Sequence, residues 1–397
     1  MTLRDPGAFL WGASTAAHQT EGGNVNSDWW ARENAADPGH ITEPSNDAAD
    51  SYHRYAEEMA LLADAGLNAY RFSVEWARIQ PEPSLVSRAQ LAHYRTMIET
   101  SRDLGLEPVV TLHHFTNPRW FADRGAWRAT DAAQLFAAYV EIVAPILDDV
   151  SVVCTINEPN MAAILAAENA VESLHAGVLP AGDQQVSHTL LEAHRAARAV
   201  LRSAGKQVGW SVAGQAFQAE PGCEQLAREH AYWREDFFLD GAQDDDWLGV
   251  QAYTRTVIGP DGPRPAPPEA ERTLTGWEYY PAALEHATRN AWERSSGTPL
   301  YVTENGIATG DDSRRIAYTT GALEGLQRAI ADGVDVRGYL HWSALDNYEW
   351  GSYRPTFGLI GFDRETFART PKPSLAWLGS VARDHAVRGT IAPTLGT

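Results

Sequence analysis

The run VVCTINEPN, residues 152–160, consists mainly of apolar and β-branched side chains and stops at Asn157-Glu158-Pro159. Valine, isoleucine and threonine fit a pleated sheet, and proline cannot continue a central strand. The run is therefore typical of a buried strand that ends at Glu158. A glutamate is most often solvated and without a chemical role. Whether Glu158 has a chemical role thus depends on which other side chains lie near this strand end.

Seven further runs of this kind alternate with segments of helical periodicity. The eight expected strands span residues 9–14, 69–76, 108–115, 152–158, 208–213, 247–253, 300–306 and 336–345. The expected helices span residues 51–65, 88–104, 131–149, 187–204, 281–294, 314–332 and 374–386. Eight parallel strands with intervening helices predict an α/β fold, the (β/α)8 TIM barrel.

One such barrel accounts for residues 1–397 as a single domain, because about 250 residues suffice for the fold and insertions can bring it above roughly 400. The rival, a doubly wound sheet, would need a glycine-rich turn after the first strand, where the chain reads ASTAAHQ. The Pro- and Gly-rich segment 259–281 is expected to be a loop that decorates the barrel mouth. In these barrels the carboxyl ends of the strands, including that of residue 158, face the active site.

The composition favours a globular enzyme and narrows its partners. The 397 residues are 44% hydrophobic, and 32 basic against 52 acidic residues give a net charge of −20. Such a charge repels nucleic acid and anionic membrane surfaces, so we expect a neutral or cationic small molecule as partner. Without a leader-like or membrane-spanning segment, the chain is expected to be cytoplasmic. Cys154 and Cys223 are expected to be plain thiols, and the sequence leaves the oligomeric state open.

A second carboxylate matches the first. Glu304 ends the seventh run, LYVTENG (300–306), after a threonine and beside an asparagine, as Glu158 does in the fourth. Two carboxylates that face each other across a barrel mouth suit glycoside hydrolysis, in which one protonates the leaving oxygen and the other attacks or stabilises the developing cation. By composition alone Glu75, at the end of the second run, is as good a candidate as Glu158.

Six motifs in order resemble the family 1 glycoside hydrolases, the β-glucosidase family. They are FLWGASTAAHQTEG (9–22), YRFSVEWARIQP (70–81), TLHHFTNP (111–118), TINEPN (155–160), YVTENG (301–306) and WSALDNYEW (342–350). The resemblance runs from residue 9 to about residue 374, and it makes Glu75 a structural ion-pair residue.

The resemblance implies a catalytic group of five residues. Glu158 would be the general acid/base, and Glu304 the nucleophile that forms a glycosyl-enzyme. This is the retaining mechanism, with the two carboxyl groups about 5–5.5 Å apart. Arg71 would keep Glu304 ionised by lowering its pKa, Tyr253 would hydrogen-bond the nucleophile, and Asn157 would bind a sugar hydroxyl.

The resemblance also implies a sugar-binding set. Its members are Gln19, His114, Phe115, Gln251, Trp342, Glu349 and Trp350. Amides and carboxylates suit vicinal hydroxyls, and an aromatic face covers the C–H side of a pyranose. Relatives that act on 6-phosphorylated sugars carry serine at the Glu349 position. A carboxylate there would repel phosphate and so favours an unphosphorylated sugar.

The chain departs from the family pattern at several positions. Gln251-Ala252-Tyr253 stands where the family has Asn-Tyr-Tyr, so Gln251 could reach farther than the asparagine or face elsewhere. His114-Phe115 replaces His-Trp, which keeps stacking area and removes an indole donor. Thr356 stands where arginine is common. The chain is also shorter than typical members between Glu158 and Tyr253, which indicates trimmed loops on the leaving-group side.

Neither a metal nor a cofactor is expected. His113 and His114 are neighbours on a strand, so their side chains point to opposite faces and cannot chelate one ion. The acidic run 244–246 is more typical of a solvated turn than of a calcium site.

The function expected from the resemblance is that of an exo-acting retaining β-glycosidase on a glucoside, galactoside or fucoside. Transglycosylation to an alcohol acceptor is an alternative, and an apolar acceptor site would favour it. A catalytically idle barrel that binds glycosides is another alternative. Idle barrels usually lose an acid, whereas both Glu158 and Glu304 are present here.

Overall fold

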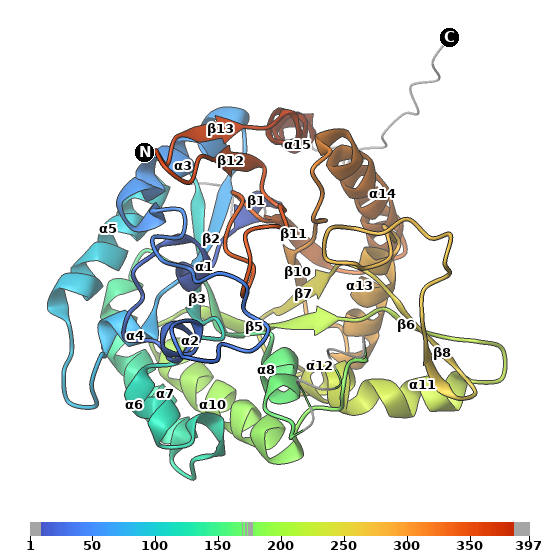
Figure 1. The fold of residues 1–397 in the computed structure, drawn as a ribbon, viewed down its shortest axis with the longest axis horizontal. Coiled ribbons are helices and arrows are strands. Elements are labelled where there is room, and N and C mark those ends of the chain that lie inside the picture. Colours follow the sequence, from blue (N-terminus) through green and yellow to red (C-terminus); the bar gives the residue numbers. More distant parts are fainter. Residues whose placement is uncertain (1–8, 169, 171–172, 174–177, 385–397) are drawn as a thin grey trace.

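The centre of the molecule is a closed barrel of eight parallel strands (Figure 1). The computed structural model describes residues 9–168, 170, 173 and 178–384. The barrel strands are β1 (Leu10–Ser14), β2 (Ala69–Ser73), β3 (Glu107–His113), β4 (Val152–Asn157), β5 (Gln207–Gly214), β7 (Leu248–Ala252), β10 (Leu300–Glu304) and β11 (Val336–Trp342). They follow one another around the barrel in this order, and β11 closes onto β1. Each of the eight apolar runs supplies one strand, so the predicted (β/α)8 barrel is confirmed.

Helices surround the barrel on its outer side (Figure 1). The long ones are α3 (Ser51–Ala65), α5 (Arg88–Asp103), α7 (Ala132–Val143), α10 (Gln184–Ser203), α13 (Ala283–Arg294), α14 (Asp312–Ala331) and α15 (Pro373–Asp384). These seven correspond to the seven predicted helices. Side-chain caps fix several starts: Asp183, for example, accepts a hydrogen bond from the Val186 amide at 2.9 Å and begins α10.

Shorter helices were not predicted. They are α1 (Ala17–Thr20), α2 (Asp28–Glu33), α4 (Trp76–Ile79), α6 (Arg119–Asp123), α8 (Pro159–Leu165), α11 (Glu224–Ala231) and α12 (Phe237–Asp240), with 3-10 turns at Ala126–Arg128 and Ala144–Ile146 and a π-helical turn at Tyr232–Asp236. In α11 only Ala227 and Ala231 are buried, so the apolar face is too narrow to produce a clear helical period.

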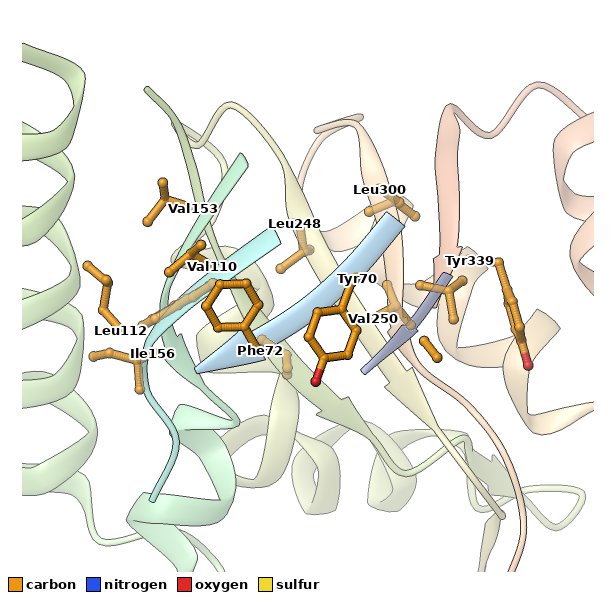
Figure 2. Packing of buried hydrophobic residues seen from close by; sticks show 14 of the residues in the cluster. Tyr70, Phe72, Val110, Leu112, Val153, Ile156, Leu248, Val250, Leu300 and Tyr339 are labelled. Carbon is orange, nitrogen blue, oxygen red and sulfur yellow. The ribbon is translucent and has the colours of Figure 1, made fainter. Parts of the chain in front are cut away.

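The largest apolar core lies between the barrel and the helices. On β2, Tyr70 and Phe72 belong to this core, whereas Ala69 belongs to a separate cluster inside the barrel. Figure 2 shows side chains of the outer core from six strands: Tyr70, Phe72, Val110, Leu112, Val153, Ile156, Leu248, Val250, Leu300 and Tyr339. Alternation along the strand therefore turns Arg71, between two outward-facing aromatic residues, toward the barrel interior.

The interior cluster fills one end of the barrel. Its members are Leu10, Ala69, Val109, Val152, Cys154, Trp247, Tyr301 and Leu340. On β2, β4 and β10 these apolar residues precede Arg71, Asn157 and Glu304 along the strand. The barrel is thus apolar toward its amino end and polar toward its carboxyl end, where an active site is expected.

Two small sheets lie outside the barrel. One joins β6 (Phe217–Ala219), β8 (Thr256–Gly259) and β9 (Gly262–Arg264), and the other pairs β12 (Ile360–Phe362) with β13 (Arg369–Pro371). Segment 259–281, expected to be loop throughout, therefore contains the three-residue strand β9. Within the described ranges, no helix is long and apolar enough to cross a membrane.

The acidic run 244–246 is only partly the solvated turn that was predicted. Asp245 is buried, accepts a hydrogen bond from His194 at 3.0 Å, and pairs with Arg198. Asp246 pairs with Arg202 at 2.9 Å. These partners lie on α10, so the run fastens this helix to the start of β7. Both cysteines are free and buried, as expected.

Candidate active site

A strained turn presents Glu158 at the end of β4. Its backbone is left-handed, with φ 45° and ψ 58°, a conformation that costs a non-glycine residue roughly 1 kcal/mol. The Glu158 amide donates to the Ser211 carbonyl at 2.7 Å, and Pro159 starts α8, where its missing amide hydrogen is no loss. Asn160 anchors the turn by donating to the Ala213 carbonyl at 2.9 Å. These contacts hold the Glu158 side chain at the carboxyl end of the barrel.

Glu304 ends β10 and is held by two donors. Arg71 Nη1 lies 2.6 Å from Glu304 Oε1, and the Tyr253 hydroxyl donates to Glu304 Oε2 at 2.5 Å. Glu304 is 3% exposed and the Arg71 side chain is fully buried. Burial raises the pKa of Glu304, while the Arg71 charge and the Tyr253 hydroxyl oppose that rise.

The surroundings of the two carboxyl groups differ. Burial raises the pKa of Glu158 well above its usual value, and the negative charge of Glu304 raises it further. Among the described residues, none donates a hydrogen bond to the Glu158 carboxyl as Arg71 and Tyr253 do to Glu304. Glu158 is therefore the group of the pair that keeps its proton, and Glu304 is the group that ionises.

Asn157 lies beside the pair and receives two hydrogen bonds on one atom. Its Oδ1 accepts from Arg71 Nη2 at 2.5 Å and from Gln251 Nε2 at 2.8 Å. Its Nδ2 therefore points the other way, and it lies 3.3 Å from His114 Nε2. Gln251 was expected to bind the sugar, but it is fully buried beneath the cavity lining. The longer side chain reaches Asn157 and supports it from below.

The end of β11 supplies an indole, and the loop after it supplies a third carboxyl group. Trp342 Nε1 donates to Glu349 Oε1 at 3.1 Å. Burial raises the pKa of Glu349 to about 8, partly offset by this hydrogen bond. A Cβ on Gly306 would lie 2.1 Å from the Trp342 carbonyl oxygen, so only glycine allows this close approach of the two strand ends.

Gln19 and His114, which both line the cavity, each have a polar atom with no protein partner among the described residues. Gln19 Nε2 donates to Asn347 Oδ1 and to the Tyr348 carbonyl, both at 3.0 Å, which leaves Gln19 Oε1 buried and unpaired. His114 Nδ1 is also buried and unpaired. Buried polar atoms are usually hydrogen-bonded, so both atoms point to a polar ligand.

These groups surround a cavity of about 400 Å³. Ten of the twelve expected site residues line it: Gln19, His114, Phe115, Asn157, Glu158, Tyr253, Glu304, Trp342, Glu349 and Trp350. Arg71 and Gln251 lie beneath the lining and act on it through Glu304 and Asn157. The volume lies within the usual range for a small-molecule site.

Trp350 packs on His18, a residue for which the sequence predicted no role in the site. Its ring stacks on His18 with centroids 5.8 Å apart and planes at 7°. His18 Nε2 lies 2.5 Å from Glu33 Oε1, and both side chains are fully buried. Trp350 also packs against the edge of Phe115 at 5.1 Å. The His18–Glu33 pair thus supports one wall of the cavity from behind.

Eight further lining residues were missed: Trp29, Arg32, His40, Met161, Leu165, Ala170, Trp277 and Phe357. Three of them lie on α2 or shortly after it, and Trp277 lies in segment 259–281, which supports the placement of that segment at the barrel mouth. No motif or period marks these positions. Only the high tryptophan count, 14 in the chain, could have drawn attention to some of them.

Glu75 is structural, but not as the predicted ion pair. It accepts hydrogen bonds from the Ala77 amide at 3.1 Å and from Thr116 Oγ1 at 2.7 Å, while Arg78 pairs with Glu21 at 2.9 Å. In the part of the chain that the structure describes, no three His, Cys, Asp or Glu side chains form a group that could hold a metal ion.

Comparisons with known proteins agree with the barrel fold. The family model of glycosyl hydrolase family 1 matches residues 2–248 and 243–387. The thermostable β-glucosidase B of Thermobispora bispora is 32% identical over 97% of this chain and 92% of its own length. The bifunctional β-D-glucosidase/β-D-fucosidase of Bifidobacterium breve is 29% identical over 98% of this chain and 100% of its own. The crystal structure of a β-glycosidase, BGL167, superposes with a TM-score of 0.89 at 42% identity and covers 99% of this chain and 100% of its own.

Proposed function

The chain belongs to glycosyl hydrolase family 1, and from this premise we propose that it is an exo-acting, retaining β-glycosidase for unphosphorylated β-D-glycosides. The observation that carries the proposal is the asymmetry of the carboxyl pair. Glu304 is held for ionisation by Arg71 and Tyr253, whereas burial and the Glu304 charge keep Glu158 protonated. A nucleophile and an acid with separated pKa values are what the reaction needs.

The reaction proceeds in two steps at the anomeric carbon. Glu304 attacks that carbon while Glu158 gives its proton to the glycosidic oxygen, which leaves as an alcohol. Formation of the glycosyl-enzyme removes the negative charge of Glu304, so the pKa of Glu158 falls and Glu158 becomes a base. It then takes a proton from water, the water oxygen attacks the same carbon, and Glu304 leaves. Two inversions restore the β configuration.

The base of the cavity suits one terminal sugar. The unpaired Gln19 Oε1 and the Glu349 carboxyl group offer partners for neighbouring hydroxyls, and Trp342 offers an aromatic face. The buried Glu349 carboxyl group offers no positive charge to a phosphorylated sugar, whose phosphate would lose its hydration there without a matching partner. Glucosides, galactosides and fucosides fit, and the glucosidase/fucosidase relative favours the first and the last.

A panel of p-nitrophenyl β-D-glycosides tests the proposal. The panel comprises gluco, galacto, fuco, manno, xylo and 6-phosphogluco substrates, with Glu304→Gln beside the wild-type protein. The matched control is Glu75→Gln, because Glu75 is also a buried glutamate that follows a strand end. We expect turnover of an unphosphorylated sugar that Glu304→Gln abolishes and Glu75→Gln retains. Turnover that survives in Glu304→Gln, or silence across the panel with folded protein, would refute it.

Transglycosylation is a second candidate, favoured by the outer part of the cavity. There Trp29, Met161, Leu165 and Trp277 offer apolar surface to an incoming alcohol. An apolar alcohol bound there would compete with water for the glycosyl-enzyme. Chromatographic detection of an alkyl β-glycoside after addition of 1-hexanol tests this candidate, and hydrolysis alone would count against it.

A further inference from the structure

The cavity has two ends of different exposure. The base is buried: Gln19 is fully buried and Glu304 is 3% exposed. Among the other lining residues, Arg32 and His40 are exposed, and Leu165 and Trp277 are each 42% exposed. An exo-acting enzyme holds the terminal sugar at the closed end. The exposed residues therefore form the mouth, where the leaving group lies, an assignment that rests on the proposed function.

The charges of the two ends are opposite in sign. Glu304, the carboxyl group held for ionisation, lies toward the base, whereas Arg32 at the mouth is the only Arg or Lys among the described lining residues. The chain as a whole carries a net charge of −20, so the positive charge at the cavity mouth is opposite in sign to that of the whole protein. An anionic group on the leaving group would meet attraction at Arg32 and repulsion nearer the base.

The Arg32 guanidinium is positioned without being neutralised. Its Cζ lies 5.2 Å from the centre of the Trp29 ring, and its Nη2 lies 3.4 Å from His40 Nδ1. Among the described residues, no carboxylate lies within ion-pair distance of it. Glu33, next to it in the chain, is instead bound to His18 and Ser45. The planar fork of Arg32 therefore has donors left for a ligand.

Aromatic surface adjoins this cation. Trp29 packs against Trp350 with ring centroids 4.8 Å apart, so it continues the wall of the sugar site outward. Trp277 packs against Tyr253 at 5.6 Å and against Phe357 at 6.4 Å. Indole rings that border the mouth favour a flat aromatic leaving group over a hydrated sugar chain.

We propose that the leaving-group site of this enzyme selects a phenol that carries a carboxylate, with the ring against Trp29 and Trp277 and the carboxylate on Arg32. A carboxylate matches the geometry of the guanidinium fork, which can bind it through two parallel hydrogen bonds. It carries one negative charge, so the ionised Glu304 repels it less than it would repel a phosphate dianion.

A matched pair of substrates isolates the carboxylate. They are the β-D-glucosides of 4-hydroxyphenylacetate and of 4-hydroxyphenylacetamide, in which a methylene insulates the phenol from the substituent and keeps the two leaving groups alike in reactivity. We expect kcat/KM for the carboxylate to exceed that for the amide about fivefold, the upper size of an exposed ion pair. The ratio should fall toward one as ionic strength rises, because salt screens exposed charges.

Variants of Arg32 locate the effect. In Arg32→Gln the ratio should fall to about one, and Arg32→Lys should keep part of it because the charge remains. Arg195→Gln is the control, since Arg195 is exposed on α10 and lies outside the cavity lining. It should keep the wild-type ratio.

The outcomes separate the inference from the proposed function. Hydrolysis of both glucosides at equal kcat/KM by the wild-type enzyme, or a ratio that survives in Arg32→Gln, would overturn the carboxylate site alone. If the folded enzyme hydrolyses neither these substrates nor any p-nitrophenyl glycoside, the proposed function fails and the inference fails with it.

Discussion

Removal of one hydroxyl group tests how the nucleophile is kept ionised. In Tyr253→Phe the ring stays packed against Trp277 and Phe357, but the 2.5 Å hydrogen bond to Glu304 Oε2 is lost. Glu304 is only 3% exposed, so solvent replaces the bond poorly. A hydrogen bond to a charged group contributes about 1.5–3 kcal/mol, and a pKa change of one unit corresponds to about 1.4 kcal/mol. The pKa of Glu304 should therefore rise by about 1–2 units.

The sign follows from the role of Glu304 as a nucleophile. A donor favours the ionised carboxylate, so its loss raises the pKa, and activity should be lost at a higher pH than in the wild-type enzyme. The assay is the acid limb of kcat/KM against pH for an aryl glycoside, which reports the free enzyme. Tyr139→Phe is the control, because its buried hydroxyl donates to the Leu112 carbonyl at 3.1 Å and, within the described ranges, hydrogen-bonds no carboxylate. An acid limb that stays in place in folded Tyr253→Phe, or moves to lower pH, would refute the reasoning.

Three further variants test other contacts of the structure. Glu158→Gln should still form the glycosyl-enzyme from activated aryl glycosides but break it down slowly, and azide should restore turnover with a β-configured product; a failure of azide to do so would count against Glu158 as the acid/base. Gln251→Leu removes one of the two donors to Asn157 Oδ1. It should lower kcat/KM roughly two- to tenfold, the effect expected for the loss of one hydrogen bond, with little change in melting temperature. An unchanged kcat/KM would show that this contact does not position Asn157. Asp245→Ala leaves buried partners unpaired and should lower the free energy of unfolding by about 3–5 kcal/mol in urea titrations. The exposed control Asp244→Ala should change it by less than about 0.5 kcal/mol, and similar values for both variants would contradict the assigned pairing.

The barrel could be predicted because its signals are local and repeated. Each strand is a short run buried on both faces. It therefore reads as a continuous apolar stretch and can be recognised without an alternating pattern. Glu158 and Glu304 each end such a run, but so does Glu75, and only the resemblance to family motifs separated the expected pair from Glu75. Short elements such as α11 and β9 escaped prediction, since a few residues with a narrow apolar face carry no period that distinguishes them from loop.

The parts of the site that were not predicted depend on contacts between residues that are far apart in the sequence. His18 and Glu33 are 15 residues apart and form a pair that supports Trp350 only when the loop after β1 is folded. Gln251 was placed in the sugar site by its motif, yet its extra methylene lets it reach Asn157 from below. The mouth residue Arg32 lies on the short helix α2, whereas Trp277 lies in a loop far along the chain, and the placement of such segments in space follows no sequence period.

The central claim is that Glu304 forms a covalent bond to the sugar. Its most direct test is peptide mass spectrometry after incubation with 2,4-dinitrophenyl 2-deoxy-2-fluoro-β-D-glucoside. The fluorine slows both steps and the activated leaving group speeds only the first, so the glycosyl-enzyme accumulates. One fluorosugar on the peptide that contains Glu304, and none in Glu304→Gln, is the predicted result. A label on Glu158, or turnover of the reagent without any covalent intermediate, would contradict the assignment of nucleophile and acid.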